Sequence, residues 1–348
     1  MNAEPTPAAL QAQRAAFYER ADTECLAPLW TRLKALVPKE PTPVGAAHRW
    51  RYADVRPYVL EAAEHISARE AERRVLILEN PGLRGSSQIT STLYAGLQLI
   101  MPGEVAPAHR HTQSALRFVV EGHGAYTAVG GEKTLMEPGD FVITPSWTWH
   151  HHGHEASGPM VWLDGLDIPM AAFYGSTFRE DHEAEQAALT RPVGDALARY
   201  GSGLLPVGHR ATSLNSPVFN YPYARTREAL FALARAGEPD AHLGHLMRYV
   251  NPVDGGWAMP TMATMVRLLP AGFATRPYRA TDGTVHIVVE GEGAIEVEGT
   301  RFDVTAHDVV VVPGWMRSTL HAASDLVLFS YSDRVAQEKL GLWREQRL

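Results

Sequence analysis

Three histidines in the first half of the chain have the spacing that a metal site requires. His109 and His111 stand two residues apart, and His150 follows Pro145 by five residues. On a β-strand, side chains two residues apart point to the same face, so His109 and His111 can bind one ion. A third imidazole from a neighbouring strand would leave positions open for a substrate, and neutral imidazoles suit iron, zinc, copper and nickel. The pattern predicts a metal site; the alternative is a set of unrelated surface histidines.

Glycine and proline punctuate both motifs at the places where tight turns are expected. Gly103 precedes His109 by six residues, and Gly139 precedes Pro145 by six. The resulting patterns, G-x5-H-x-H and G-x5-P-x4-H, resemble the two metal-binding motifs of the cupin superfamily. This resemblance implies that the histidines lie on strands of a small β-barrel.

The residues that follow the histidine pair determine the charge of the predicted site. Many cupins carry a glutamate ligand four or five residues after the pair, where this chain has Ala115 and Leu116. We therefore expect a three-histidine site that keeps the full charge of a divalent metal. Arg117 has an even offset from the pair and faces the same interior, where it implies a buried anion. That anion is either a substrate carboxylate or a structural acid, and Asp164 can bind a substrate hydroxyl or pair with an arginine.

The cluster HHHGH at residues 150–154 requires a choice of ligand. Strand alternation puts His150 and His152 on one face, and the distance from the proline favours His150 as the ligand. His152 then has two interpretations, a pocket residue that supports the site or moves a proton, or a structural histidine held by hydrogen bonds. We expect His151 and His154 to face solvent.

The chain contains two related β-rich units. Residues 116–147 and 285–315 both contain a strand, a Glu-Gly turn, further strands with a turn, and a Pro-x-Trp sequence. Short strands with glycine turns are typical of antiparallel barrels and jelly rolls. The second unit has Tyr278, Ala280 and Ser318 where the first has its histidines, so it should bind no metal there. A shared scaffold alone would not require the histidines of the first unit.

The remaining sequence frames these two units. Helix-forming composition and apolar spacing predict helices over residues 8–18, 31–36, 56–73, 225–235 and 335–347, with a strand over 74–79. The fold class is therefore mainly β, with two antiparallel barrels in one bicupin chain. We divide the chain into an N-terminal helical segment (1–80), a metal-binding cupin domain (81–170), a connecting segment (171–252), and a degenerate cupin domain with a C-terminal helix (253–348).

Composition excludes several classes of protein. The chain has 348 residues and a net charge of −7, so no basic surface favours nucleic acid. No apolar run is long enough to cross a bilayer, and residues 1–7 lack a signal-peptide pattern. Cys25 is the single cysteine, which excludes an intrachain disulfide and favours a cytoplasmic location.

Long stretches of the chain resemble the gentisate 1,2-dioxygenase family, including its salicylate and 1-hydroxy-2-naphthoate relatives. The resemblance covers nearly the whole chain and is carried by residues 72–82, 92–132, 138–154, 161–169 and 219–230. It implies a homotetrameric bicupin enzyme of aromatic catabolism with Fe(II) at His109, His111 and His150. It also implies substrate-pocket or catalytic roles for six further residues: Arg73, Tyr94, Gln98, Arg117, His152 and Asp164. The chain departs from the family at His151, where relatives often have aspartate.

The implied reaction opens gentisate between C1 and C2 with O2 to give maleylpyruvate. Salicylate or 1-hydroxy-2-naphthoate is the alternative substrate, because each keeps a carboxylate beside a hydroxyl. For Tyr94 and Gln98, ordinary barrel packing is the alternative role. Two alternative functions belong to other classes of protein: a metal-dependent isomerase that uses no oxygen, and a non-catalytic ligand-binding cupin. Three histidines also fit zinc, and O2 dependence separates the oxygenase from both.

Overall fold

The structure is a computed structural model that describes residues 6–348. The chain separates into two compact units, Met1–Thr42 and Pro43–Leu348. The first unit holds α1 (Pro7–Thr23) and α2 (Leu29–Leu36), which confirm the first two predicted helices. Thr6 caps α1 by accepting from the Ala9 backbone N–H, next to a proline at the first helical position. Residues 1–5 of the predicted N-terminal segment lie outside the described residues.

The second unit begins with short elements that lead into the first barrel. These are β1 (His48–Trp50), α3 (Tyr52–His65), α4 (Ala68–Ala71), β2 (Val75–Ile77) and the 3-10 turn η1 (Pro81–Leu83). The prediction of one helix over 56–73 was wrong, because the backbone of Ile66 is extended and ends α3. Ser67 then caps α4 by accepting from the Glu70 N–H.

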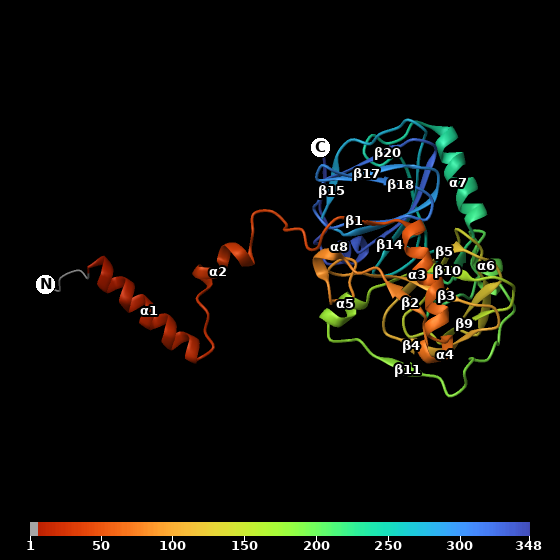
Figure 1. The fold of residues 1–348 in the computed structure, drawn as a ribbon, viewed down its shortest axis with the longest axis horizontal. Helices are drawn as coiled ribbons and strands as arrows, with labels where there is room; N and C mark the ends of the chain where they lie inside the picture. The colour runs from red at the N-terminus through yellow and green to blue at the C-terminus, as the bar shows by residue number, and fades with distance from the viewer. Residues whose placement is uncertain (1–5) are drawn as a thin grey trace. The chain divides into compact units, whose positions relative to one another are not determined.

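Two sheets form the first barrel (Figure 1). One sheet has the order β12-β8-β5-β10-β3-β2, and the other has the order β11-β4-β9-β6-β7. Their strands are β3 (Tyr94–Ile100), β4 (Val105–His111), β5 (Ala115–Glu121), β6 (Ala125–Val129), β7 (Glu132–Leu135), β8 (Phe141–Thr144), β9 (His150–His154), β10 (Met160–Leu166), β11 (Arg179–Asp181) and β12 (Asn220–Tyr221).

The second barrel repeats this plan, with sheets β1-β19-β16-β21-β14-β13 and β18-β17-β20-β15-β22, drawn mainly in blue in Figure 1. Its strands are β13 (His245–Arg248), β14 (Ala263–Leu269), β15 (Tyr278–Ala280), β16 (Thr284–Glu290), β17 (Gly293–Val297), β18 (Thr300–Val304), β19 (Val309–Val312), β20 (Ser318–Ala322), β21 (Leu326–Ser332) and β22 (Glu345–Arg347). The mainly β, two-barrel fold class is confirmed.

Strand register matches the metal-site positions of the two barrels. His109 pairs with His150 between β4 and β9, and Tyr278 pairs with Ser318 between β15 and β20. The duplication inferred from sequence therefore extends to the pairing of these residues, and strand pairing can assign counterparts between the barrels.

The main hydrophobic core lies between the barrels. It contains outward-facing residues of both six-stranded sheets, and Phe118 stacks on Phe329 with ring centroids 4.5 Å apart. Because strand side chains alternate, the intervening residues of the same strands face their own barrel interior. Arg117 and His286, each next to a core residue, are therefore interior residues of the first and second barrel.

The segment between the barrels does more than connect them. It holds α5 (Ile168–Phe173), α6 (Asp195–Tyr200) and α7 (Tyr223–Ala236), and the last confirms the helix predicted over 225–235. It also supplies β11 and β12 to the first barrel and β13 to the second. Sequence periodicity did not predict these strands, because they are two to four residues long and pair at sheet edges.

The C-terminal tail differs from its prediction. The helix expected over 335–347 is only α8 (Arg334–Lys339). Gly341 has a positive φ of 72°, which ends helical geometry, and β22 then pairs with β15. No helix within residues 6–348 has the length and apolarity to span a membrane.

Candidate metal centre and active site

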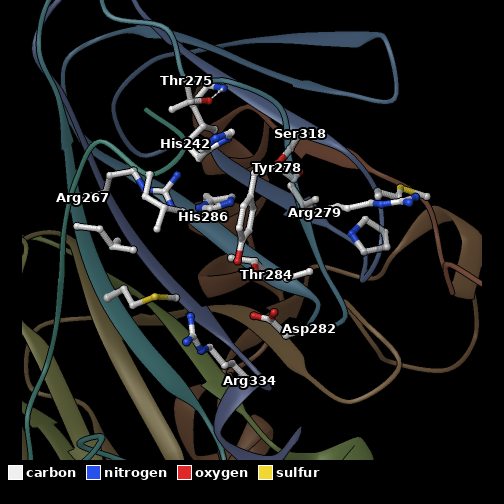
Figure 2. A pocket seen from close by; sticks show the side chains of 18 residues that line it. His242, Arg267, Thr275, Tyr278, Arg279, Asp282, Thr284, His286, Ser318 and Arg334 are labelled. Atoms are coloured by element: carbon white, nitrogen blue, oxygen red, sulfur yellow. Dashed lines mark hydrogen bonds between the residues drawn. The ribbon is translucent and has the colours of Figure 1, made fainter. Parts of the chain in front are cut away.

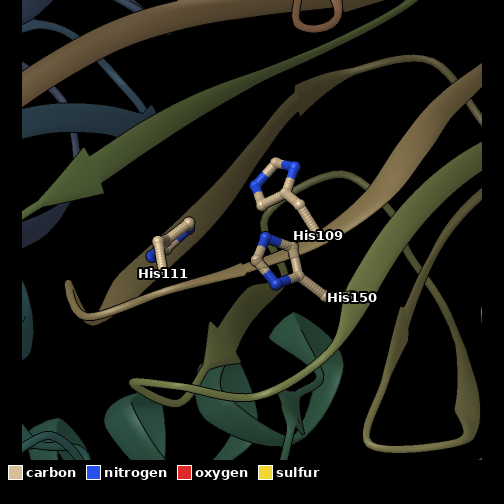
Figure 3. A group of neighbouring side chains, drawn as sticks. All are labelled: His109, His111 and His150. Carbon is tan, nitrogen blue, oxygen red and sulfur yellow. The ribbon is translucent and has the colours of Figure 1, made fainter. Parts of the chain in front are cut away.

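Three histidine rings meet inside the first barrel (Figure 3). One ligand-capable nitrogen of each of His109, His111 and His150 lies within 4.8 Å of the others. The pairing of β4 with β9 places His109 opposite His150, and the two-residue spacing brings His111 to the same face. The rings are close enough to share one ion.

All three imidazoles are held in the neutral form that binds metals. Burial is the main cause: it lowers the pKa of His111 to about 4 and, with the nearby Arg73, that of His109 to about 2. Burial also lowers the pKa of His150 well below its usual value. A neutral ring keeps a lone pair available for a cation, so the chemistry of this donor set fits a divalent metal.

Two of the rings are oriented by backbone carbonyls. Nδ1 of His111 donates to the Gln113 carbonyl at 2.9 Å, and Nδ1 of His150 donates to the Thr148 carbonyl at the same distance. A proton on Nδ1 leaves Nε2 as the free donor atom. Both rings are therefore arranged to present Nε2 to an ion.

The third ring contacts an arginine. Nη2 of Arg73 lies 3.1 Å from Nδ1 of His109 and also donates to the Pro107 carbonyl at 2.9 Å. A guanidinium group only donates, so His109 accepts in this contact. With Nδ1 accepting, the proton of the neutral ring lies on Nε2, so a metal at Nε2 of His109 would require that proton to leave Nε2.

A cavity of about 410 Å³ opens beside the histidines. Its volume falls within the usual range for small-molecule sites, about 300–1,000 Å³. Eight of the nine residues predicted for the site line this cavity: Arg73, Tyr94, Gln98, His109, His111, Arg117, His150 and Asp164. His152, the ninth, is fully buried behind them.

Arg117 and Asp164 are the charged pair of the cavity. They are paired across β5 and β10, and Nε of Arg117 lies 3.6 Å from Oδ1 of Asp164. Asp164 also accepts from Nε1 of Trp162 at 3.0 Å. Burial raises the pKa of Asp164 to about 6 even though Arg117 opposes that shift. Because Arg73 and Arg179 line the same cavity, its three arginines outnumber its one acid, and the site favours an anionic ligand.

His152 supports Arg117 from behind. Nη2 of Arg117 donates to Nε2 of His152 at 3.0 Å, and Nδ1 of His152 donates to Oγ1 of Thr127 at 2.9 Å. The second terminal nitrogen of Arg117 donates to Oγ1 of Thr144. Since both ring nitrogens of His152 have partners, this geometry is that of a positioning residue.

Tyr94 contributes an aromatic ring to the wall of the cavity. Tyr94 is partly buried, and burial and the nearby Asp164 raise its pKa. A Cβ atom at Gly96 would lie 2.9 Å from the Tyr94 hydroxyl and 2.4 Å from Cγ1 of Val75. The absence of a side chain at this position therefore allows the tyrosine ring its place.

The connecting segment supplies cavity residues that sequence reasoning missed. Thr177, Phe178 and Arg179 line the cavity because β11 pairs with β4, which sets Arg179 opposite His111. Arg179 also donates to Oε2 of Glu72 at 2.7 Å. The arginine and phenylalanine in this loop were visible in the sequence, but nothing local indicated which strand they join.

The expectation that His151 and His154 face solvent was wrong. Both are buried, with 1% and 2% of their surface exposed. His151 packs edge-on against Tyr126, and Nε2 of His154 donates to the Gly158 carbonyl at 2.7 Å. Strand alternation placed His151 on the outer face correctly, but other parts of the chain cover that face.

Comparisons with known proteins agree with this geometry. Residues 96–166 match the cupin domain family. The chain is 52% identical to gentisate 1,2-dioxygenase 1 of Aquipseudomonas alcaligenes, over 97% of this chain and 98% of that protein. It is 34% identical to the 1-hydroxy-2-naphthoate 1,2-dioxygenase of a Nocardioides species, over 99% and 92%.

A solved structure extends the likeness to three dimensions. The salicylate 1,2-dioxygenase of Pseudoaminobacter salicylatoxidans, crystallised with gentisate, superimposes with a TM-score of 0.90 at 33% identity, over 100% of this chain and 96% of that chain. The three-histidine group and these relatives together support a metal cofactor. The chain belongs to the gentisate 1,2-dioxygenase family and is a bicupin ring-cleaving dioxygenase.

Proposed function

We propose that this enzyme binds Fe(II) at His109, His111 and His150 and opens gentisate between C1 and C2. Both atoms of O2 enter the product, maleylpyruvate. The observation that carries the proposal is one cavity that is lined by three neutral imidazoles and three arginines. The 52% identity to a gentisate 1,2-dioxygenase over almost the full chain supports the choice of substrate.

The three-histidine site suits an anionic, chelating substrate. Because its ligands carry no charge, a divalent ion there keeps its full charge for a carboxylate and the neighbouring phenolate. When bound, Fe(II) would supply adjacent positions for the substrate and O2 and a path for electrons between them, because O2 reacts poorly with closed-shell aromatic compounds.

The arginines orient the substrate. Arg117 can bind the carboxylate in a charge-assisted contact, because its guanidinium lines the cavity and is fixed by Thr144 and His152. Arg73 adds a second positive charge on the same side, and burial with the neighbouring Arg117 lowers its pKa to about 9. It therefore stays protonated at neutral pH. Held in this way, the ring presents the edge with its carboxylate and neighbouring hydroxyl to the metal.

Asp164 and His152 complete the proposed machinery. Asp164 lines the cavity, and its carboxylate form would accept a hydrogen bond from the 5-hydroxyl of gentisate. His152 keeps Arg117 in position and does not contact the substrate. Gln98 and Tyr94 form the walls beside the ring, where they discriminate between ring substituents.

Salicylate and 1-hydroxy-2-naphthoate are the second candidate substrates. They keep the carboxylate and adjacent hydroxyl that the arginines and metal would bind, but they lack the 5-hydroxyl for Asp164. The relatives named for these acids, at 33% and 34% identity, are the observation that favours them.

Oxygen uptake tests the proposal directly. Enzyme reconstituted with Fe(II) is given gentisate, salicylate or 1-hydroxy-2-naphthoate in parallel, with Zn(II)-loaded and anaerobic samples as controls. We expect the Fe(II)-loaded enzyme to consume one O2 per gentisate and to give a ring-opened product. The Zn(II)-loaded enzyme should do neither. Turnover without O2 would contradict the dioxygenase proposal and favour an isomerase. Absence of turnover with all three acids, despite bound iron, would favour a ligand-binding cupin.

We also propose a cytoplasmic homotetramer. The exposed free Cys25 fits a reducing compartment. The proposal of a tetramer rests on the resemblance to the family. Light scattering during gel filtration measures the mass of the assembly. A monomer at micromolar concentration would contradict it.

A further inference from the structure

The second barrel has its own interior cavity, of about 70 Å³ (Figure 2). Tyr278, Ala280 and Ser318, the counterparts of the three histidines, all line it. It therefore occupies the place in the second barrel that the active-site cavity occupies in the first. Its size is about half of the roughly 150 Å³ that holds a benzene molecule, so it suits a ligand of only a few atoms.

Strand register assigns the counterparts of the charged residues. Arg117 pairs with Asp164 in the first barrel, and His286 pairs with Ser330 in the second. The second barrel therefore has no acid at the position of Asp164. Ser330 therefore lacks the carboxylate with which Asp164 balances the charge of Arg117 in the first barrel.

A different interior position in the second barrel carries an arginine. Gln98 pairs with Trp162 on β10, and Arg267 pairs with Leu328 on β21, so Arg267 is the counterpart of Gln98. It lies on the interior face of β14, because its neighbours Val266 and Leu268 belong to the core between the barrels. Figure 2 shows Arg267 and His286 lining the same side of the cavity.

Arg267 has no counter-ion in contact. Within residues 6–348 it makes no hydrogen bond or ion pair, and its Nε atom is buried without a partner. Burial lowers its pKa to about 10, so the side chain is still charged at neutral pH. Arg267 is half-buried, and its guanidinium has no partner for the buried Nε atom. An unpaired charge that is partly removed from water costs free energy, and an anion in the cavity would offset that cost.

The nearest acids are engaged elsewhere. Asp240 pairs with Arg347 at 3.0 Å, and Asp282 accepts from Nε1 of Trp343 at 2.8 Å. The Glu345 carboxylate accepts from the Tyr278 hydroxyl at 2.8 Å. These carboxylates do not contact Arg267, so the charge in the cavity is left for a ligand to balance.

His286 adds a polar group beside the arginine. Its Nδ1 lies 2.7 Å from Oγ of Ser330, and burial together with Arg267 lowers its pKa to about 3. The ring is therefore neutral and does not repel the guanidinium of Arg267. It can donate one hydrogen bond to an oxygen atom. Of the three arginines that line the cavity, Arg279 contacts Gln346 and Arg334 pairs with Glu338. Arg267 is therefore the lining arginine whose charge has no partner among the described residues.

We propose that the second barrel binds a small oxyanion, with Arg267 as its counter-ion. The shared chemistry is two or more oxygens with a negative charge, as in the carboxylate of a small organic acid or in inorganic phosphate. Arg267 is suited to either because its fork of donors matches two oxygens at once. This proposal does not depend on which aromatic acid the first barrel cleaves.

Thermal unfolding of the iron-loaded enzyme tests the site. Samples at one pH and one ionic strength contain sodium chloride, acetate or phosphate at increasing concentration. A ligand that binds the native state raises Tm with the logarithm of its concentration above Kd. We expect such a rise with acetate or phosphate, and the anion that gives the larger rise identifies the source of the oxygens.

The variant Arg267→Gln carries the residue that the first barrel has at the counterpart position. It should have a higher Tm than wild type in chloride, because it lacks the unpaired charge, and should lose the anion-dependent rise. Arg301→Gln is the control, since Arg301 is an exposed residue of the same barrel paired with Asp303. Calorimetric titration with the preferred anion should give at least a tenfold weaker Kd for Arg267→Gln and no change for Arg301→Gln.

The metal centre of the first barrel can also bind these anions, so the comparison between variants isolates the second site. An equal anion response in wild type and Arg267→Gln would overturn the proposal. Should Arg267→Gln not fold, Ser330→Asp replaces it, because it puts the acid of the first barrel on β21, two residues from Leu328, the residue that pairs with Arg267. Loss of the anion response in Ser330→Asp would support the proposal, and a full response would refute it.

Discussion

The two barrels share a scaffold and differ in what faces their interiors. Residues that pack between the barrels are apolar in both, and Phe118 and Phe329 even stack on one another across the interface. On the interior faces, His109 and Asp164 have the counterparts Tyr278 and Ser330. Packing therefore preserves the scaffold, and a few interior positions determine whether a barrel can do metal chemistry.

The barrels also differ in how they treat a buried arginine. Arg117 is fixed by Asp164, Thr144 and His152. Arg267 has no such partner. In the first barrel the arginine is positioned for a substrate that comes and goes, and its own acid stabilises it between turnovers. In the second barrel the arginine depends on an external anion.

The largest effect is expected from removing a histidine of the first barrel. His150→Ala should lose the metal and reduce turnover below detection, because two imidazoles do not hold a divalent ion in an open site. Metal analysis and oxygen uptake measure both. Ser318→Ala, at the counterpart position of the second barrel, should change neither. Full metal content in His150→Ala would refute the ligand assignment.

This part of the site was predictable from the sequence. The spacing of His109, His111 and His150 follows from strand periodicity alone, and the Gly and Pro punctuation fixes the turns that bring them together. Arg117 was also expected in the pocket, and the structure places it there, but the even offset is not the reason, because the pair lies on β4 and Arg117 on β5. The pocket role of Asp164 came from the family resemblance. Periodicity cannot say that Arg117 and Asp164 approach within 3.6 Å, since that depends on which strands pair.

The remaining features depend on long-range pairing. The β11 strand that carries Arg179 to the cavity is three residues long and has no pattern of its own. His151 is covered by parts of the chain that no local signal identifies. The end of α8 was missed although Gly341 was visible, because helix-forming residues on both sides favoured a continuous helix. The single-residue predictions that failed were those in which tertiary contacts override the preference of the local sequence.

Arg117→Gln should have the second largest effect. It removes a charge-assisted contact worth about 1.5–3 kcal/mol, so kcat/KM should fall about 10- to 100-fold, mainly through KM. It also leaves Asp164 without its arginine, so Tm should fall. Steady-state kinetics with oxygen uptake and thermal unfolding measure the two effects.

The matched control for Arg117→Gln is His286→Gln, which replaces the counterpart in the second barrel. It should leave KM unchanged. An unaltered KM in Arg117→Gln would show that the carboxylate is held elsewhere, with Arg73 as the next candidate.

The pH dependence should separate the barrels further, because the second barrel has Ser330 at the position of Asp164. Burial raises the pKa of Asp164 to about 6, above its value in the unfolded chain. The folded state therefore favours the protonated form, and the stability that this group contributes falls as pH rises through about 4 to 6. Activity has the opposite slope, because the carboxylate form is needed to accept from the substrate hydroxyl.

For this reason kcat/KM for gentisate should fall on the acidic side with an apparent pKa at or below about 6, since a bound divalent ion favours the carboxylate. Asp164→Asn should lower kcat/KM and lose that limb of the profile. Salicylate, which has no 5-hydroxyl, should not respond to Asp164→Asn in this way. An identical acidic limb in Asp164→Asn would assign the titration to another group.

The smallest effect is expected from His152→Leu, which installs the residue of the second barrel, Leu320, at the counterpart position. Arg117 would lose one of its two side-chain acceptors while the three metal ligands stay intact. Metal content should therefore be unchanged, and kcat/KM should fall about tenfold, as for the loss of a group that orients a functional residue.

The form of that loss distinguishes positioning from proton transfer. A positioning residue acts through Arg117, so His152→Leu should raise KM, and its effect should largely disappear in the background of Arg117→Gln. A residue that moves a proton would lower kcat and change the pH profile, and its effect would persist without Arg117. Because both ring nitrogens of His152 already have partners, at 3.0 Å and 2.9 Å, we expect the first result.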